Sequence, residues 1–262
     1  MNCFRAGFFA ECRRRRGCIL NFMTEIADED IESIPPTPER VAARAMVLAA
    51  VSCRGAIEKD ADKPGAEELR KRILPWLEEI GAASELESTE TALISTPLGK
   101  IDRKAGVNAS WRSEGMLVLA WVLQCAELPR VHIQCDPADT ANVMGFLDDR
   151  ENTPLHDSRL RNIAEIERWA DTYLTLHWRL RLLESDPGPK DFVACVAACN
   201  WGPLRLDQLE LVDNDISIDG VQIDKLDYTK YRQTLSIAQE RHQAFNWLLG
   251  FEQLYSHVTT DT

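Results

Sequence analysis

The hydrophobic pattern of the chain is centred on residues 111–129, which read WRSEGMLVLAWVLQCAELP. Within residues 115–123 every position is apolar or glycine, so this segment has no polar stripe that would face water. A helix that is hydrophobic on all sides lies inside a protein or inside a membrane. The run is about half of the roughly 20 apolar residues that a bilayer crossing needs, and Pro129 lies beyond its end. The pattern therefore predicts a buried central helix, with Arg112 and Glu114 at its polar entrance.

Three helices are predicted before the central one. Thr37 is a suitable N-cap and a proline follows it, so the first helix is expected over about residues 38–58. A second helix is expected over roughly 65–80, where apolar residues recur at helical spacing. A third, shorter helix covers about 84–94, and residues 95–103 are expected to form a loop.

Four more helices are predicted after the central one. Asp136 is a suitable N-cap for a helix that ends near Asp149. The longest periodic segment is 158–185, whose apolar residues alternate spacings of four and three. That spacing is a strong helix signal. A short helix over 190–200 and a last helix over about 228–249 complete the set.

One β element is predicted, at residues 215–223, which read DISIDGVQI. Alternating isoleucine and valine flank Asp219 and Gly220, the pair that a two-residue hairpin turn prefers. Residues 209–212 are a candidate for a third short strand. The predicted fold class is therefore mainly α: a compact helical bundle around a buried central helix, with one small β-hairpin.

The first 22 residues differ from the rest of the chain. They hold five arginines and one acidic residue, and the arginines interrupt every apolar stretch that a secretory signal would need. An arginine-rich, acid-poor start is also typical of a transit peptide. We prefer a disordered N-terminal extension over residues 1–22, upstream of an alternative start at Met23. A single helical domain is then expected over residues 23–262.

Charge and cysteine content narrow the classes of function. The formal net charge is −12, which disfavours binding to nucleic acid and favours a basic protein partner. The eight cysteines lie mostly in apolar surroundings, where a thiol behaves as a small hydrophobe. Cys195 and Cys199 share one face of a short helix, where apolar packing is preferred over a metal or redox role. We expect a cytoplasmic protein that associates with no membrane and needs no cofactor. The sequence does not indicate an oligomeric state.

Several segments together resemble one bacterial family. They are residues 111–129, the pair Cys135 and Asp136, the sequence LHWR at 176–179, the sequence ERHQAFNWLLG at 240–250, and the ending VTTDT. Over roughly residues 38–262 the chain is similar to the family catalogued as domain of unknown function 4272. The resemblance implies a soluble bacterial protein with no assigned reaction, and it supplies no catalytic residues.

Two histidines lie on the apolar stripes of the two longest predicted helices after the central one. His177 follows Tyr173 by four residues, and His242 follows Ala238 by the same spacing, so both are expected to face the core. Two inward histidines that meet are candidates for a metal site or a proton relay. Zinc needs three or four convergent ligands, and no Cys-x-x-Cys or His-x-x-x-His spacing supplies the others. We therefore expect buried, neutral, hydrogen-bonded histidines and no metal site.

Polar residues at the edges of the apolar stripes are the candidate binding residues. They are Arg112, Glu114, His177, Arg181, Glu240, Arg241, Asn246 and Asp261. They either line a polar pocket between helices or form ion pairs and amide bonds that fix how the helices pack. The carboxylates at the chain end, including Asp261, are expected to hold the tail against the bundle near Arg112 or Arg241. The sequence contains no nucleophile elbow, phosphate loop or dinucleotide fingerprint, so no catalytic residue is assigned.

Two functions from different classes fit these observations. The leading hypothesis is a non-enzymatic protein-binding module, immunity- or antitoxin-like, whose acidic surface meets a basic partner. The alternative is an enzyme or small-ligand binder with a site built from Arg112, Glu114, His177 and Arg241. Convergence of these residues in one water-accessible pocket would favour the alternative, whereas dispersal as isolated pairs would favour the binding module.

Overall fold

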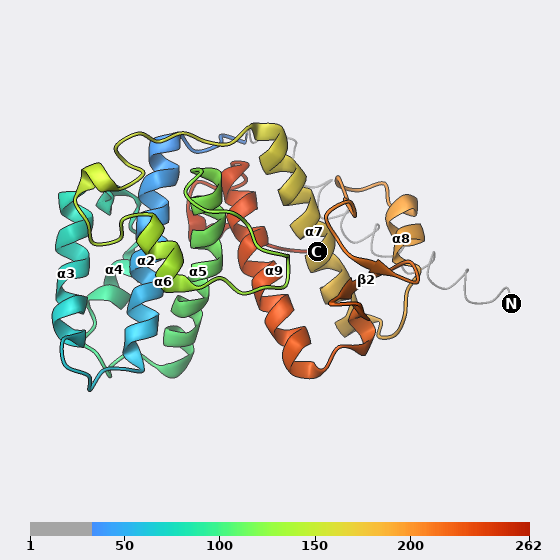
Figure 1. The fold of residues 1–262 in the computed structure, drawn as a ribbon, viewed down its shortest axis with the longest axis horizontal. Coiled ribbons are helices and arrows are strands. Elements are labelled where there is room, and N and C mark those ends of the chain that lie inside the picture. The colour runs from blue at the N-terminus through green and yellow to red at the C-terminus, as the bar shows by residue number, and fades with distance from the viewer. Residues whose placement is uncertain (1–32) are drawn as a thin grey trace, which may run out of the picture. The chain divides into compact units, whose positions relative to one another are not determined.

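Five helices lie side by side in the order α3, α2, α5, α9 and α7 (Figure 1). Their bounds are Ala66–Glu79 for α3, Pro38–Glu58 for α2, Arg103–Val122 for α5, Tyr228–Leu248 for α9 and Ile163–Ser185 for α7. The computed structural model describes residues 33–262, and Ile34–Thr262 form one compact unit. The expectations for residues 1–22 and for a start at Met23 concern residues outside the described range. The mainly α fold predicted from the sequence is confirmed.

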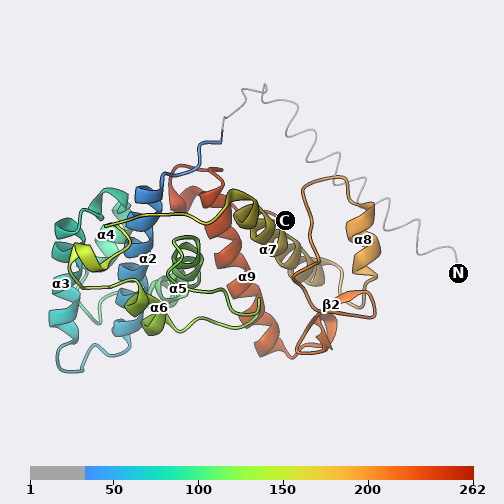
Figure 2. The same cartoon turned by 45° about the horizontal axis from the view of Figure 1, so that its top comes forward.

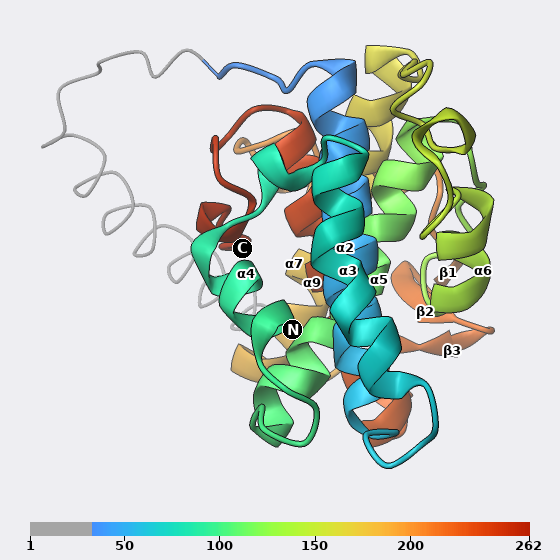
Figure 3. The ribbon, with the colours of Figure 1, turned by 90° about the vertical axis from the view of Figure 1, so that its left-hand side faces the viewer.

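Shorter elements cover the row of helices. Helix α4 (Ser88–Ser95) and the C-terminal tail lie on one side of the row, and α6 (Pro137–Val143) lies on the other (Figure 3). Helix α8 (Phe192–Ala198) and the small sheet lie beyond α7 (Figure 2). Short 3-10 helices occur at Ala83–Glu85, Arg150–Asn152, Ile223–Lys225 and Tyr255–His257.

The buried central helix is α5, but it begins earlier than the hydrophobic run suggested. The Asp102 side chain accepts a hydrogen bond from the Ala105 backbone at 3.0 Å and so caps a helix that starts at Arg103. Arg112 and Glu114 consequently lie in the middle of the helix, and the expectation that they mark its entrance is wrong. The error arose because the first turns are amphipathic and lack the continuous apolar pattern of the later ones.

Helix α2 packs closely along α5. A Cβ atom added at Gly55 of α2 would lie 2.5 Å from the Ser110 backbone nitrogen and 2.7 Å from the Gly106 carbonyl oxygen of α5. Glycine at this position therefore allows the two backbones to approach, and any side chain there would force them apart.

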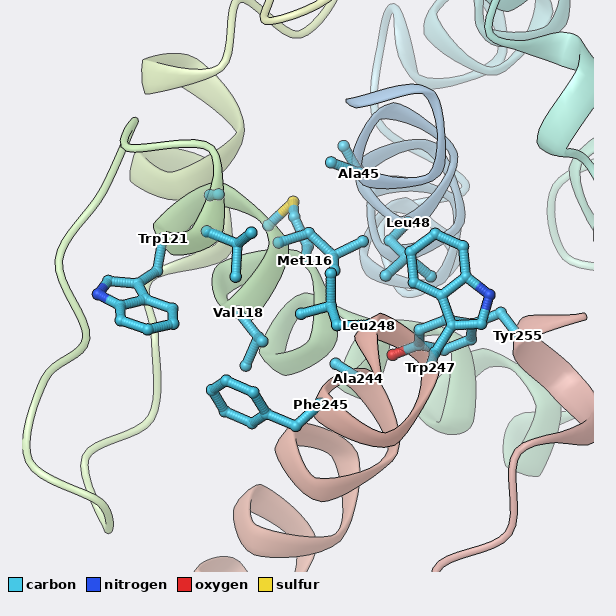
Figure 4. Close-up of a cluster of buried hydrophobic side chains, with 14 of the residues drawn as sticks. Ala45, Leu48, Met116, Val118, Trp121, Ala244, Phe245, Trp247, Leu248 and Tyr255 are labelled. Carbon is cyan, nitrogen blue, oxygen red and sulfur yellow. The ribbon is translucent and has the colours of Figure 1, made fainter. Parts of the chain in front are cut away.

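The core is continuous from α2 through α5 to α9, as Figure 4 shows. Trp121 of α5 and Phe245 of α9 meet edge to face with ring centroids 5.9 Å apart, and Phe245 stacks on Tyr173 of α7 at 5.5 Å. Full burial of side chains of this size contributes about 1.5–3 kcal/mol each. These contacts bind three neighbouring helices into one packed layer.

The predicted hairpin is present and belongs to a three-stranded antiparallel sheet, in the order β1 (Leu211–Val212), β2 (Asp215–Ile218) and β3 (Val221–Gln222). Asp219 and Gly220 have φ values of 52° and 77°, as a type I′ turn requires, so the hairpin prediction is confirmed. Of the candidate strand at residues 209–212, the last two residues form β1. A second two-residue turn with positive φ joins β1 to β2.

Three further helix ends differ from the sequence-based expectation. Helix α4 begins at Ser88 rather than near 84, because Ala83–Glu85 form a separate 3-10 helix. Helix α6 ends at Val143 rather than near Asp149, because Gly145 and Leu147 adopt φ values of 70° and 67° that end the helical pattern. Helix α7 begins at Ile163 rather than 158, because an asparagine directly before it caps its first turn.

Candidate functional site

Glu114 and Arg241 form an ion pair in which both side chains have no exposed surface. One Glu114 oxygen accepts a bond from Arg241 Nε at 2.8 Å, and the other accepts the Cys135 backbone N–H at 2.9 Å. Arg241 also donates to the Tyr173 hydroxyl and to the Ile133 carbonyl, each at 2.7 Å. The network joins α5, α7 and α9 to the segment between α5 and α6. These contacts give both charged side chains hydrogen-bond partners inside the protein, so the pair is arranged to hold the structure together.

The protonation of this network is fixed by its surroundings. Burial lowers the pKa of Arg241, but the Tyr173 hydroxyl and the Glu114 carboxylate outweigh burial and raise it overall. Burial also raises the pKa of Tyr173 above its usual value. The guanidinium is therefore charged and the phenol neutral near pH 7.

Arg112 lies farther out, where α5 faces α9. Its Nη1 donates to Glu240 at 3.0 Å and to the Gln243 side-chain oxygen at 2.7 Å. Burial raises the pKa of Glu240, and Arg112 opposes that shift. The Arg112 side chain keeps 27% of its surface exposed, so this pair is open to solvent on one side.

His177 of α7 and His242 of α9 meet inside the bundle, each with 2% of its surface exposed. Their Nδ1 atoms are 3.1 Å apart, so one ring donates a hydrogen bond to the other. Burial lowers the pKa of His177 to about 3 and that of His242 to about 4. Both rings are therefore neutral near pH 7, as expected from the sequence. In residues 33–262 no group of three or more metal-ligating side chains converges.

The remaining candidates are also dispersed. Arg181 is on the surface, with its Nε 3.8 Å from Glu184. Asn246 donates to the Thr259 carbonyl at 3.1 Å and so contacts the C-terminal tail. Asp261 is exposed and makes no ion pair within the described part of the chain.

The tail returns to the bundle near Arg112, as predicted, with the Tyr255 ring centroid 5.7 Å from the Arg112 guanidinium, but the predicted contact of Asp261 does not form. Tyr255 and Val258 are buried, and Gln243 donates to the Tyr255 carbonyl at 2.8 Å. Arg112 pairs with Glu240 and Arg241 pairs with Glu114, and neither arginine forms an ion pair with Asp261. The prediction that Asp261 meets one of these arginines is therefore wrong. Buried side chains and backbone carbonyls hold the tail instead.

A polar pocket of about 170 Å³ lies between α2, α4, α5 and the tail. Its polar lining includes Arg44, Glu87, Glu90, Asn108, Arg112 and Tyr255. Of these, Arg112 alone is among the candidates predicted from the sequence. Arg44 is 1% exposed and is the lone charged residue in a long apolar stretch of α2, a signal that would have identified it.

An acidic surface lies at the C-terminal end of α3. We call it the acidic corner; its residues are Glu78, Glu79, Asp148, Asp149 and Glu151, all of them exposed. Trp76 donates its indole N–H to the Asp148 carbonyl at 2.7 Å, and Arg150 donates to the Ile80 carbonyl, so the loop is fixed against the helix end. None of the five carboxylates has an ion-pair partner within the described residues.

The fold and these contacts define a helical protein whose inner polar groups mainly satisfy one another and whose surface carries excess negative charge. Among the described helices, none has both the length and the apolar character needed to cross a bilayer. The chain belongs to the family described as domain of unknown function (DUF4272), whose model matches residues 14–191. The match begins within the first 22 residues and ends before the 240–250 segment. No curated protein and no solved structure matches the chain.

Proposed function

We propose that this protein is a non-enzymatic binding module that meets a basic protein partner through its acidic corner. The observation that carries the proposal is the position of Glu78 and Glu79 in the last turn of α3, which contains no basic residue. Carboxylates at a helix C-terminus oppose the helix dipole, and each such contact costs about 0.3–1 kcal/mol. When exposed residues destabilise the fold in this way, a role for them in binding is favoured.

The dispersal of the polar candidates supports a binding module over an enzyme. Glu114 is enclosed with Arg241, and His177 is enclosed with a second histidine. Arg112 pairs with Glu240 in a second, partly solvent-exposed pair between the same two helices as Glu114 and Arg241. Catalysis by these residues would require them to converge on one accessible space, whereas each pair instead fixes two helices relative to each other.

The electrostatics of the acidic corner suit a cationic partner. The loop carrying Asp148, Asp149 and Glu151 is bonded to the end of α3 through Trp76 and Arg150, so it adjoins the helix end that carries Glu78 and Glu79, and the Arg150 charge offsets one of the five negative charges. Exposed charges interact over about 8 Å at physiological ionic strength, and like charges within that range repel. A basic partner relieves this repulsion, and attraction between opposite fields also speeds the encounter. An immunity- or antitoxin-like protein would use its acidic surface in this way.

Site-specific photo-crosslinking tests the proposal. A photoreactive amino acid replaces Glu79 in one variant and Glu167, which is exposed on α7, in a matched control. In the cells that make the protein, we expect a basic protein to crosslink at position 79 and not at 167. We also expect capture to weaken as salt is raised. Equal crosslinking at both positions, or an acidic or neutral crosslinked protein, would contradict the proposal.

A neutralised protein provides the second arm of the test. Converting the five acids of the acidic corner to their amides should abolish capture of the crosslinked partner. The control converts five exposed acids elsewhere, namely Asp139, Glu167, Glu210, Asp213 and Glu252, and should leave capture unchanged. Equal losses from the two variants would show that net charge acts without a defined surface, and the acidic corner would then lose its assigned role.

A further inference from the structure

The polar pocket beside the tail has features that the proposed protein-binding function does not use. Its walls come from α2, α4, α5 and residues 255–256, and a second hollow of about 380 Å³ shares Glu87, Thr89, Tyr255 and Ser256 with it. Figure 3 shows α4 and the C-terminus on the same side of the helix row. The pocket is therefore a space that forms only once the tail has docked.

One part of the lining is suited to a carboxylate. Arg112 uses Nη1 for its two hydrogen bonds within residues 33–262, and its Nε and Nη2 have no acceptor among those residues. These two atoms form the edge of a guanidinium that binds carboxylates through two parallel bonds. Asn108 lies one helical turn before Arg112, is exposed, and also lines the pocket, so its amide can add a further donor.

Another part of the lining is suited to an ammonium group. Glu90 is paired with Arg44, whereas Glu87 accepts the Ser256 backbone N–H at 3.0 Å and the Glu90 backbone N–H in a capping box, and pairs with Arg44 Nη1 at 3.6 Å. A carboxylate has about four acceptor positions, so Glu87 retains capacity for a further donor. A cationic ligand group placed there would be attracted by the carboxylates of both glutamates.

The mixed charge of the pocket selects against singly charged ligands. A simple anion at Arg112 would also face the carboxylates of Glu87 and Glu90, and a simple cation at Glu87 would face the two guanidiniums. A molecule that carries both charges avoids both repulsions. Val51 and Leu93 supply apolar surface in the same pocket, which can cover a small side chain.

We infer that this pocket binds a free α-amino acid with a small uncharged side chain. The ligand carboxylate lies on the open edge of Arg112, and its ammonium group lies beside Glu87. The docked tail supplies one wall, so ligand binding stabilises the tail in its docked position. This site is separate from the acidic corner, and its test is independent of the partner proposed above.

Thermal unfolding and calorimetric titration of the full chain test the inference. The probes are L-alanine, L-serine and L-valine, each compared with its N-acetyl derivative and its carboxamide at the same concentration. We expect at least one free amino acid to raise the melting temperature and to bind with a measurable Kd. Both derivatives should bind about tenfold more weakly or worse, because each lacks one of the two charges. Equal binding of either derivative, or no response to any free amino acid at about 10 mM, would overturn the inference.

Two variants connect the response to this pocket. Arg112→Gln should weaken binding by about tenfold or more, whereas Arg181→Gln, which changes an exposed arginine on α7, should leave it unchanged. Asn108→Asp adds a negative charge at an exposed position of the pocket and should weaken binding even if Arg112→Gln fails to fold. Unchanged affinity in Asn108→Asp would contradict the assignment of the carboxylate position.

Discussion

Replacing Arg241 by Met should destabilise the protein severely. Arg241 has no exposed surface and donates to Glu114, Tyr173 and the Ile133 carbonyl. The variant leaves the Glu114 carboxylate buried, with the Cys135 backbone N–H as its remaining donor. Removing one partner of a buried ion pair costs roughly 3–5 kcal/mol, because an uncompensated charge remains in the interior. Total stabilities of natural domains are about 5–15 kcal/mol, so the loss is a large fraction of the whole.

Urea unfolding followed by circular dichroism measures this loss. A double variant, Glu114→Gln with Arg241→Met, should be more stable than Arg241→Met alone, because it no longer buries a charge. It should remain less stable than the original protein, since unsatisfied buried groups cost about 1–3 kcal/mol each. The matched control is Arg181→Met at an exposed ion pair, which should change stability by less than about 1 kcal/mol. If Arg241→Met falls within about 1 kcal/mol of the original protein, the interpretation of this network as a structural junction is wrong.

Three further predictions concern pH, the hairpin and the tail. Stability should fall as pH drops from about 6.5 to 5, because the unfolded chain binds protons that His177 and His242, with folded-state pKa values of about 3 and 4, exclude. Converting both to Gln should reduce that slope in urea titrations, and an unchanged slope would contradict it. Gly220→Val should lower the free energy of unfolding by roughly 1–2 kcal/mol, because Gly220 has a φ of 77°. Gly220→Asn should lower it less, because asparagine tolerates positive φ. Equal losses from the two variants would argue against strain in the turn. Tyr255→Ala should lower the free energy of unfolding by roughly 3 kcal/mol, because the ring is buried. Deletion of residues 261–262 should change it by less than about 0.5 kcal/mol. A larger loss from the deletion than from Tyr255→Ala would restore a role for the terminal carboxylates.

Local signals predicted most of the helix positions. Thr37 and Asp136 are each an N-cap residue followed directly by a proline. The observed helix starts at positions 38 and 137 agree with the prediction. The hairpin turn was identified for a similar reason, since Asp219 and Gly220 adopt the positive φ values that their residue types favour. In each case the chemistry that fixes the element lies within a few residues of it.

The pairing of polar side chains could not be predicted in the same way. Glu114 and Arg241 are 127 positions apart in sequence, and their contact depends on how α5 and α9 pack. Their positions at the edges of apolar helix stripes marked both residues as candidates. Those positions did not predict which residue each would contact. Arg44 was not predicted because its neighbours in α2 form an apolar stretch, although a buried arginine requires a carboxylate partner such as Glu90.

The most direct test of the account combines stability and binding in one variant, Glu78→Gln with Glu79→Gln. Removing these charges from the last turn of α3 should raise the free energy of unfolding by about 0.3–1 kcal/mol for each residue. The same protein should capture less of the partner that crosslinks at position 79. The control variant Glu167→Gln should change neither quantity. A gain in stability together with a loss of capture supports the acidic corner as a binding surface, whereas a loss of stability or undiminished capture would contradict it.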